Sequence, residues 1–214
     1  MRRNGPLRSL SRLLEPLLVG GEWTAAVGFL VVLQIVGFGL QLLLPPGVIF
    51  DDLSLGGPSA EAFQPWRFLT FLFVNHPRPL VGGLALALNL IVFGIVAGEA
   101  GQLLGTGRFL LFYAVAAAGA AVGGVLAAAG GEVYGAIGPV AGTIFAFGMA
   151  NPLRRIYGKI PARLFAVSLA LLLLGGHFAI LAIGDPGTVR EPWTIVCQAI
   201  GGGASAYLYF LARP

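Results

Sequence analysis

Long stretches without charge alternate with short polar breaks along the chain, and this pattern predicts membrane-spanning helices. A helix needs about 20 mostly apolar residues to cross about 30 Å of hydrocarbon. Six windows approach or reach that length, each ended by charged residues or proline. The predicted spans are residues 24–44, 80–98, 109–131, 138–153, 164–184 and 193–212. We therefore expect an all-α integral membrane protein, with residues 24–212 forming one six-helix membrane domain behind a basic leader, residues 1–23.

The fourth window differs from the others because it opens with Gly138 and Pro139, shortly after Gly135. Proline fits best in the first turn of a helix, where its missing N–H leaves no gap in the hydrogen-bond ladder. A helix over 139–150 is only about 18 Å long at 1.5 Å per residue, too short to cross a bilayer. The pattern predicts a short central helix entered by a buried loop, with a glycine and proline kink in an ordinary span as the alternative.

Composition excludes a soluble globule, since 57% of the 214 residues are hydrophobic and only 10% are charged, against about 25% charged in soluble domains. The net charge of +4 indicates topology rather than nucleic-acid binding, because Lys and Arg are retained on the cytoplasmic side. With the amino terminus inside, ten of the 13 basic residues fall in inner segments: Arg2, Arg3, Arg8, Arg12, Arg108, Arg154, Arg155, Lys159, Arg163 and Arg213. Both termini are then cytoplasmic.

The leader carries a stripe of leucines with Arg8 and Arg12 off it. This pattern is typical of a helix in the inner headgroup layer; alternatively, these arginines only orient the first span. Cys197 is the only cysteine, so neither an intrachain disulfide nor a cysteine-rich metal cluster is expected. The sequence also lacks a metal-ligand spacing and a phosphate-cradling motif, so no cofactor is expected.

Four short motifs occur in order, the first before the second span and the last in the sixth. They are Trp66-Arg67, Asn89 with Glu99, Gly135-Ala-Ile137-Gly138-Pro-Val-Ala-Gly142, and Gln198-Ala-Ile-Gly201. In these motifs and their spacing, the chain resembles the rhomboid family of intramembrane serine proteases from about Trp66 to Tyr209. The resemblance implies a six-transmembrane-helix bundle with a short central fourth helix. Gly138 with Gly142, and Gly201 with Ser205, have the spacing of small residues that lets helix backbones approach closely.

The departures from the family fall on its chemistry. The resemblance implies a serine nucleophile at the start of the fourth helix and a histidine base on the sixth, but these positions hold Ile137 and Gln198. Neither side chain can do that work. Asn89 is retained as an oxyanion-binding group, whereas the position one turn earlier, commonly histidine, is Ala85. We expect a pseudoprotease in a bacterial inner membrane, surrounded by lipid, that binds transmembrane helices of other proteins without cleaving them.

Two other functions stay open, an intramembrane protease with an unassigned nucleophile and a small channel or carrier. Ser168 and His177 cannot form a pair, because nine residues place them on opposite faces of one helix, about 13 Å apart. Cys197 could meet His177 across the fifth and sixth helices, although Cys usually packs as a small apolar residue. His177 is either functional, as ionisable groups within spans often are, or a hydrogen-bonded interior histidine. His76 is expected in an outer loop.

Overall fold

The computed structural model describes residues 23–45, 48–56, 64–128, 131–150, 154–156, 159–184 and 191–212. The main helices are α2 (Ala25–Leu43), α5 (Pro79–Leu104), α6 (Thr106–Ala128), α7 (Ile137–Ala150), α8 (Ala162–Gly184) and α9 (Glu191–Leu211). The short elements are α3 (Val48–Leu53), α4 (Arg67–Thr70), η1 (Phe71–Phe73), β1 (Leu55–Gly56), β2 (Glu132–Val133), β3 (Arg155–Ile156) and β4 (Ile160–Pro161). Of the predicted leader, all but Trp23 lies outside the described residues.

Five helices are long and apolar enough to cross a membrane: α2, α5, α6, α8 and residues 192–211 of α9. They coincide with five of the six predicted windows, and α5 continues past Glu99 to Leu104. The fourth window holds α7, which has 14 residues and is therefore only about 21 Å long. The described part of the chain thus has five candidate spans and one shorter apolar helix, which lies at the position of the predicted short fourth helix.

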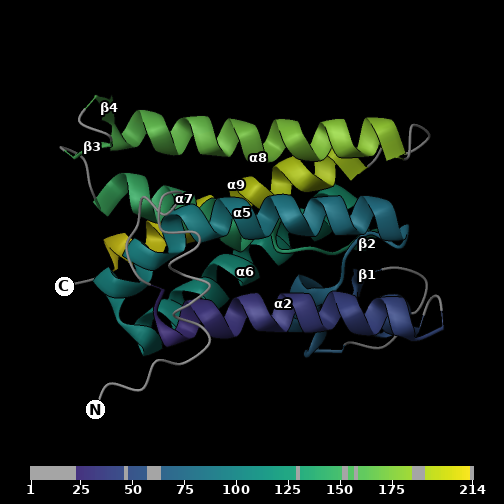
Figure 1. The fold of residues 1–214 in the computed structure, drawn as a ribbon. Helices are drawn as coiled ribbons and strands as arrows, with labels where there is room; N and C mark the ends of the chain where they lie inside the picture. The colour runs from purple at the N-terminus through teal and green to yellow at the C-terminus, as the bar shows by residue number, and fades with distance from the viewer. Residues whose placement is uncertain are drawn as a thin grey trace, which may run out of the picture.

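The long helices lie side by side, with α8 along one edge of the bundle, α2 along the opposite edge and α5 between them (Figure 1). The short helix α7 is central, since it packs against α5, α6, α8 and α9 and most of its residues are buried. The start of α2 and the end of α9 lie at the same end of the bundle (Figure 1).

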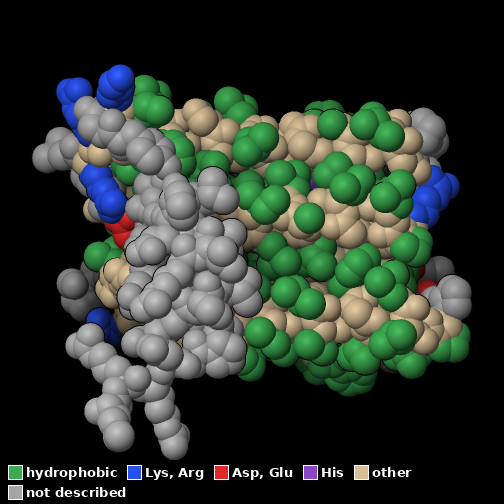
Figure 2. Space-filling model, viewed as in Figure 1, with side chains coloured by type: hydrophobic (Ala, Val, Ile, Leu, Met, Phe, Trp, Pro, Cys, Tyr) green, Lys and Arg blue, Asp and Glu red, His purple; other side chains and the backbone are tan. Residues whose placement is uncertain are grey.

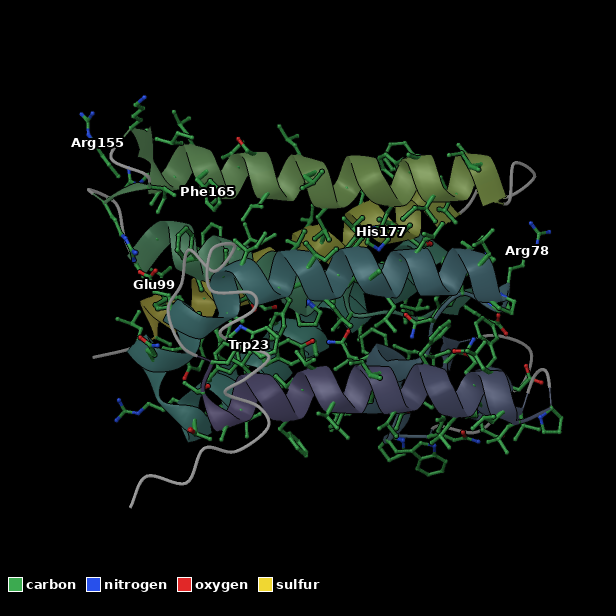
Figure 3. All side chains as sticks on the ribbon, viewed as in Figure 1. Trp23, Arg78, Glu99, Arg155, Phe165 and His177 are labelled. Carbon is green, nitrogen blue, oxygen red and sulfur yellow. The ribbon has the colours of Figure 1, made fainter. Side chains whose placement is uncertain are left out.

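Basic residues gather at this end of the bundle. The α5–α6 junction, the β3–β4 hairpin and the start of α8 lie here (Figure 1), and they carry a set of residues that we call the cationic end: Arg108, Arg154, Arg155, Lys159 and Arg163. Figure 3 shows Arg155 and Glu99 at this end and Arg78 at the opposite end, and in Figure 2 hydrophobic side chains cover much of the surface between them.

Glycines let α6, α7 and α9 approach until their backbones touch. A Cβ on Gly119 or Gly123 of α6 would overlap the α9 backbone, and a Cβ on Gly201 would overlap the carbonyl oxygen of Gly119. Likewise, a Cβ on Gly142 would lie 3.0 Å from both the Ala116 Cβ and the Gly202 oxygen. Small residues at helix contacts are the usual means of close packing in membranes, where no hydrophobic effect drives helices together.

Two short antiparallel strand pairs lie at opposite ends of the bundle. β1 pairs with β2, placing Leu55 beside Val133, and this joins the segment that follows α2 to the approach to α7. β3 pairs with β4 through Arg155 and Pro161, and α8 begins directly after this hairpin. The first pair fixes the loop that enters the central helix.

Candidate cavity at the start of α7

A cavity of about 50 Å³ lies between α5, α8, α9 and the loop before α7, with room for a few water molecules. Five of the sequence-predicted site positions line it together: Ala85, Asn89, Gly135, Ile137 and Gln198. The other polar residues of its lining are Asn75, His76, Glu132, Tyr134, His177 and Thr194. The cavity therefore brings together positions that lie more than 100 residues apart in the chain.

The start of α7 forms one wall of this cavity. Gly135 has a φ of 92°, which side-chain-bearing residues rarely adopt, and its N–H donates to the Phe71 carbonyl oxygen at 2.9 Å. This turn delivers Ile137, 2% exposed, to the first position of α7. A Cβ on Gly138 would lie only 2.8 Å from the Gln198 carbonyl oxygen, so the chain around residues 137–138 lies directly against residue 198.

Two carboxamide side chains that line the cavity, Asn89 of α5 and Gln198 of α9, have unpaired oxygens. Gln198 is 2% exposed, and its Nε2 donates to the Tyr134 carbonyl oxygen at 3.4 Å, while its Oε1 has no partner among the described residues. Asn89 Oδ1 is likewise buried without a hydrogen-bond partner among the described residues. Since a buried acceptor without a donor costs about 1–3 kcal/mol, the two oxygens indicate a site that accepts N–H or O–H groups.

His76 lies in the loop before α5 and lines the cavity. The sequence predicted the loop but did not indicate that this side chain is buried in the cavity wall. The residue precedes α5 and is 4% exposed, with its Nδ1 accepting the Arg78 N–H at 3.1 Å. Its ring lies edge-on to Tyr134 at 6.1 Å between centroids. The signal available in the sequence was its place just before the helix that carries Ala85 and Asn89. Tyr134 and Thr194 were missed although they lie one residue before Gly135 and four residues before Gln198, because neither is itself a motif position.

His177 lies between α8 and α5 (Figure 3) and is 7% exposed. Its Nδ1 is 2.8 Å from the Leu173 carbonyl oxygen, so in the neutral ring Nδ1 carries the proton and Nε2 is the acceptor. His177 is thus an interior hydrogen-bonded histidine that also lines the cavity.

The structure does not bring Cys197 to His177 at this cavity. Cys197 is not part of the cavity lining, and its backbone packs against Gly123 of α6. Ser168 is exposed and donates to the Leu164 carbonyl oxygen at 2.9 Å. Within the described ranges, there is no group of three or more His, Cys, Asp or Glu side chains that could hold a metal ion.

The remaining motif residues lie outside the cavity and make structural contacts. Arg67 is 3% exposed, and its guanidinium donates to the Gln64 side chain and to the Ser54 carbonyl oxygen at 3.1 Å. Trp66 is half exposed. Glu99, at the cationic end, forms an ion pair with Arg154, which joins α5 to the segment after α7.

The lateral wall between α5 and α8 is closed. A Cβ on Gly184 would overlap the Val81 side chain, and one on Gly176 would lie only 2.5 Å from Leu88 Cδ2. The Arg78 guanidinium adds a hydrogen bond of 2.7 Å to the Gly184 carbonyl oxygen. Access from the lipid side between these two helices therefore requires α8 to move away from α5.

Five candidate spans around a short, buried central helix define a multi-pass integral membrane protein. Residues 62–210 match the family model of the rhomboid domain. The chain therefore belongs to the rhomboid family, which confirms the resemblance in its sequence motifs. None of the curated proteins and none of the solved structures compared with the chain matches it.

Proposed function

We propose that this protein is a rhomboid pseudoprotease, which binds a transmembrane helix of a partner protein without cleaving it. The observation that supports this function is that Ile137 and Gln198 line the same cavity as Asn89. Hydrolysis through a covalent intermediate requires a nucleophile activated by a base. The hydrocarbon side chain of Ile137 cannot act as a nucleophile, and the carboxamide of Gln198 cannot act as a base. The cavity around these two positions is nevertheless present.

The cavity has chemistry that suits a helix end. The first turn of any helix carries N–H groups without intrahelical partners. Asn89 Oδ1 and Gln198 Oε1 are buried acceptors without a donor among the described residues, and they are complementary to such groups. A partner helix would reach them through the α5–α8 wall, where glycine contacts and the Arg78 hydrogen bond hold the helices together.

We also propose that the cationic end faces the cytoplasm of a bacterial cell, with both termini on that side of the inner membrane. Five described basic residues, defined above as the cationic end, support this orientation, since Lys and Arg near helix ends are retained in the cytoplasm. The cavity would then open toward the outer half of the membrane.

The test uses the protein in nanodiscs with a transmembrane peptide that carries a photoreactive residue. We expect crosslinking of the peptide, no cleavage, and no labelling by a fluorophosphonate probe. The matched control is the double variant Ile137→Ser with Gln198→His, which restores a nucleophile and a base at adjoining positions and should gain fluorophosphonate labelling that neither single variant shows. Reproducible peptide cleavage by the unaltered protein would overturn the proposal.

A second candidate, an intramembrane protease with another nucleophile, is favoured by one observation. Thr194 and His177 line the same cavity, and a hydroxyl with an imidazole base is a pair that proteases use. Under this function, the unaltered protein cleaves the peptide, and Thr194→Ala and His177→Ala each abolish cleavage. Cleavage that persists in both variants would exclude this pair.

A further inference from the structure

A second and larger cavity, of about 490 Å³, lies between α7, α8 and α9. We call it the α7–α9 groove. Its lining is apolar apart from one charged residue, Arg163. Several lining residues are open to the outside, among them Val167 at 55% and Ile200 at 64% exposed. The groove is therefore an apolar recess on the perimeter of the bundle, with a volume in the range of about 300–1,000 Å³ that small-molecule sites have.

On α7 and α8 the groove begins at the cationic end and extends about half of the way across the bundle, and on α9 its lining runs from Val196 to Gly203, in the middle and first half of that helix. On α8 its lining runs from Arg163 to Leu174, about 17 Å at 1.5 Å per residue. On α7 it runs from Met149 to Ala141, about 12 Å on the same basis. One leaflet contributes about 15 Å of hydrocarbon, half of the total of about 30 Å. Along α7 and α8, the length of the groove thus matches the acyl region of a single leaflet.

Charge is concentrated where the groove begins. Arg163 is exposed at its rim, and the exposed Arg155 and Lys159 lie on the hairpin that leads directly into α8. Among the described residues at this end, the acidic side chain is Glu99, and it pairs with Arg154. A long cationic side chain beside an apolar surface can keep its charge at headgroup level while its stem packs on hydrocarbon.

From these observations we propose that the α7–α9 groove binds an anionic glycerophospholipid, with its phosphate at Arg163 and one acyl chain along α7 and α8. Basic pockets between transmembrane helices are suited to anionic headgroups. This inference does not depend on the function proposed for the cavity at the start of α7, because it uses different lining residues.

The dimensions argue against a transmembrane helix as the occupant. A spanning helix covers the full thickness of about 30 Å and is about 10 Å across with its side chains. Along α7 and α8 the groove covers about one leaflet, and an uncharged helix offers no anionic group to the exposed Arg163 at its rim. A lipid chain anchored by its phosphate fits both the length and the charge.

The experiment titrates the detergent-purified full chain with phosphatidylglycerol or phosphatidylcholine and counts bound lipids by native mass spectrometry. We expect one phosphatidylglycerol to bind at least tenfold more tightly than phosphatidylcholine. Arg163→Gln should remove this preference. Arg108→Gln is the matched control, because Arg108 belongs to the cationic end but not to the groove lining, and it should retain the preference.

A second pair of variants tests the acyl chain separately from the headgroup. A Cβ on Gly203, which lines the groove, would meet no atom within 4 Å, and the same holds for Gly175 outside the lining. Gly203→Phe should therefore fill the groove and reduce binding of both lipids at least fivefold, whereas Gly175→Phe should leave binding unchanged.

Three results would each overturn the proposal. The first is equal affinity of the unaltered protein for the two lipids. The second is an equal loss in Arg163→Gln and Arg108→Gln, which would indicate general surface attraction. The third is specific protein–protein crosslinking, in native membranes, from a photoreactive residue at Val167, which would assign the groove to a partner helix or a second copy.

Discussion

Arg67 is a buried cation that holds together the chain between α2 and α5. Its guanidinium reaches the Ser54 carbonyl oxygen at 3.1 Å and the Gly56 carbonyl oxygen at 3.5 Å. A planar fork of donors can serve several acceptors at once, which the single ammonium of lysine cannot do in the same geometry. The sequence motif predicted a structural role for Arg67. The hydrogen bonds define that role as fixing the backbone at Ser54 and Gly56.

We predict that Arg67→Leu destabilises the protein by about 2–5 kcal/mol, because buried carbonyl groups lose their donor at about 1–3 kcal/mol each. Thermal unfolding in detergent measures the effect, with Arg67→Lys expected to fall between the variant and the unaltered protein. Arg155→Leu serves as a control at an exposed position, where changes stay within about 0.5 kcal/mol. Equal unfolding temperatures for Arg67→Leu and Arg155→Leu would contradict the structural role.

The cavity residues that could be predicted from the sequence lie on helices, whereas those that could not include a loop residue, His76. Ala85, Asn89, Ile137 and Gln198 lie at fixed helical positions, so family spacing locates them. His76 lies in a loop with no helical period, and its burial depends on contacts with Tyr134, which is 58 residues away. Such long-range contacts leave no local pattern.

Among the helices, the contact between α6 and α9 depends on glycine at defined positions. Gly201 lies against the Gly119 carbonyl oxygen, whereas Gly203, two residues further on, has no atom within 4 Å of a Cβ. The two glycines therefore form a matched pair on one helix.

We predict that Gly201→Ala destabilises the protein by about 1–3 kcal/mol through overpacking, while Gly203→Ala is neutral or slightly stabilising, because alanine favours helix. The measurement is again thermal unfolding in detergent. If the two variants unfold at the same temperature, the close approach of α6 and α9 is not required for stability.

The pairing of α5 with α8 makes a prediction about access to the cavity. Because a Cβ on Gly176 would lie 3.6 Å from Leu88 Cγ, cysteines at these two positions bring their sulfur atoms within reach of a disulfide. In a Cys197→Ala background, we expect Leu88→Cys with Gly176→Cys to crosslink on oxidation. The oxidised protein should lose transmembrane-peptide crosslinking, and reduction should restore it. Retention of peptide crosslinking in the oxidised protein would show that partners do not enter between α5 and α8.

At the scale of the whole molecule, charge is distributed unequally between the two ends. The described basic residues of the cationic end outnumber its acidic residues, while Asp51 and Asp52 lie on α3 and Glu132 lies on β2 at the opposite end.

This distribution predicts the orientation in the membrane. Single cysteines at Lys159 and Asp52, in a Cys197→Ala background, can be probed in spheroplasts with a membrane-impermeant maleimide. We expect immediate labelling at position 52 and labelling at position 159 only after permeabilisation, since basic ends are retained inside. The reverse pattern would invert the proposed topology.

The element boundaries on this scale were largely predictable, because charges and prolines end apolar runs. The prediction ended the second span at residue 98, whereas α5 continues to Leu104 and is capped at Gly105, which has a φ of 74°. A charge such as Glu99 ends a hydrophobic window without ending a helix when an ion pair with Arg154 compensates it. The strand pairs were not predicted, because two-residue strands have no measurable period.

The pairing of β1 with β2 has a consequence for the order in which the protein is made. Leu55 and Val133 are partners across 78 residues, and the Phe71 carbonyl oxygen takes the N–H of Gly135. The segment that carries His76 is synthesised long before the residues of β2 and the following loop that pack against it. Because non-local contacts form only after the intervening chain is present, this half of the cavity stays open while α5 and α6 enter the membrane. The wall around His76 is therefore completed only when β2 and the start of α7 arrive, and the cavity as a whole only when α8 and α9 follow.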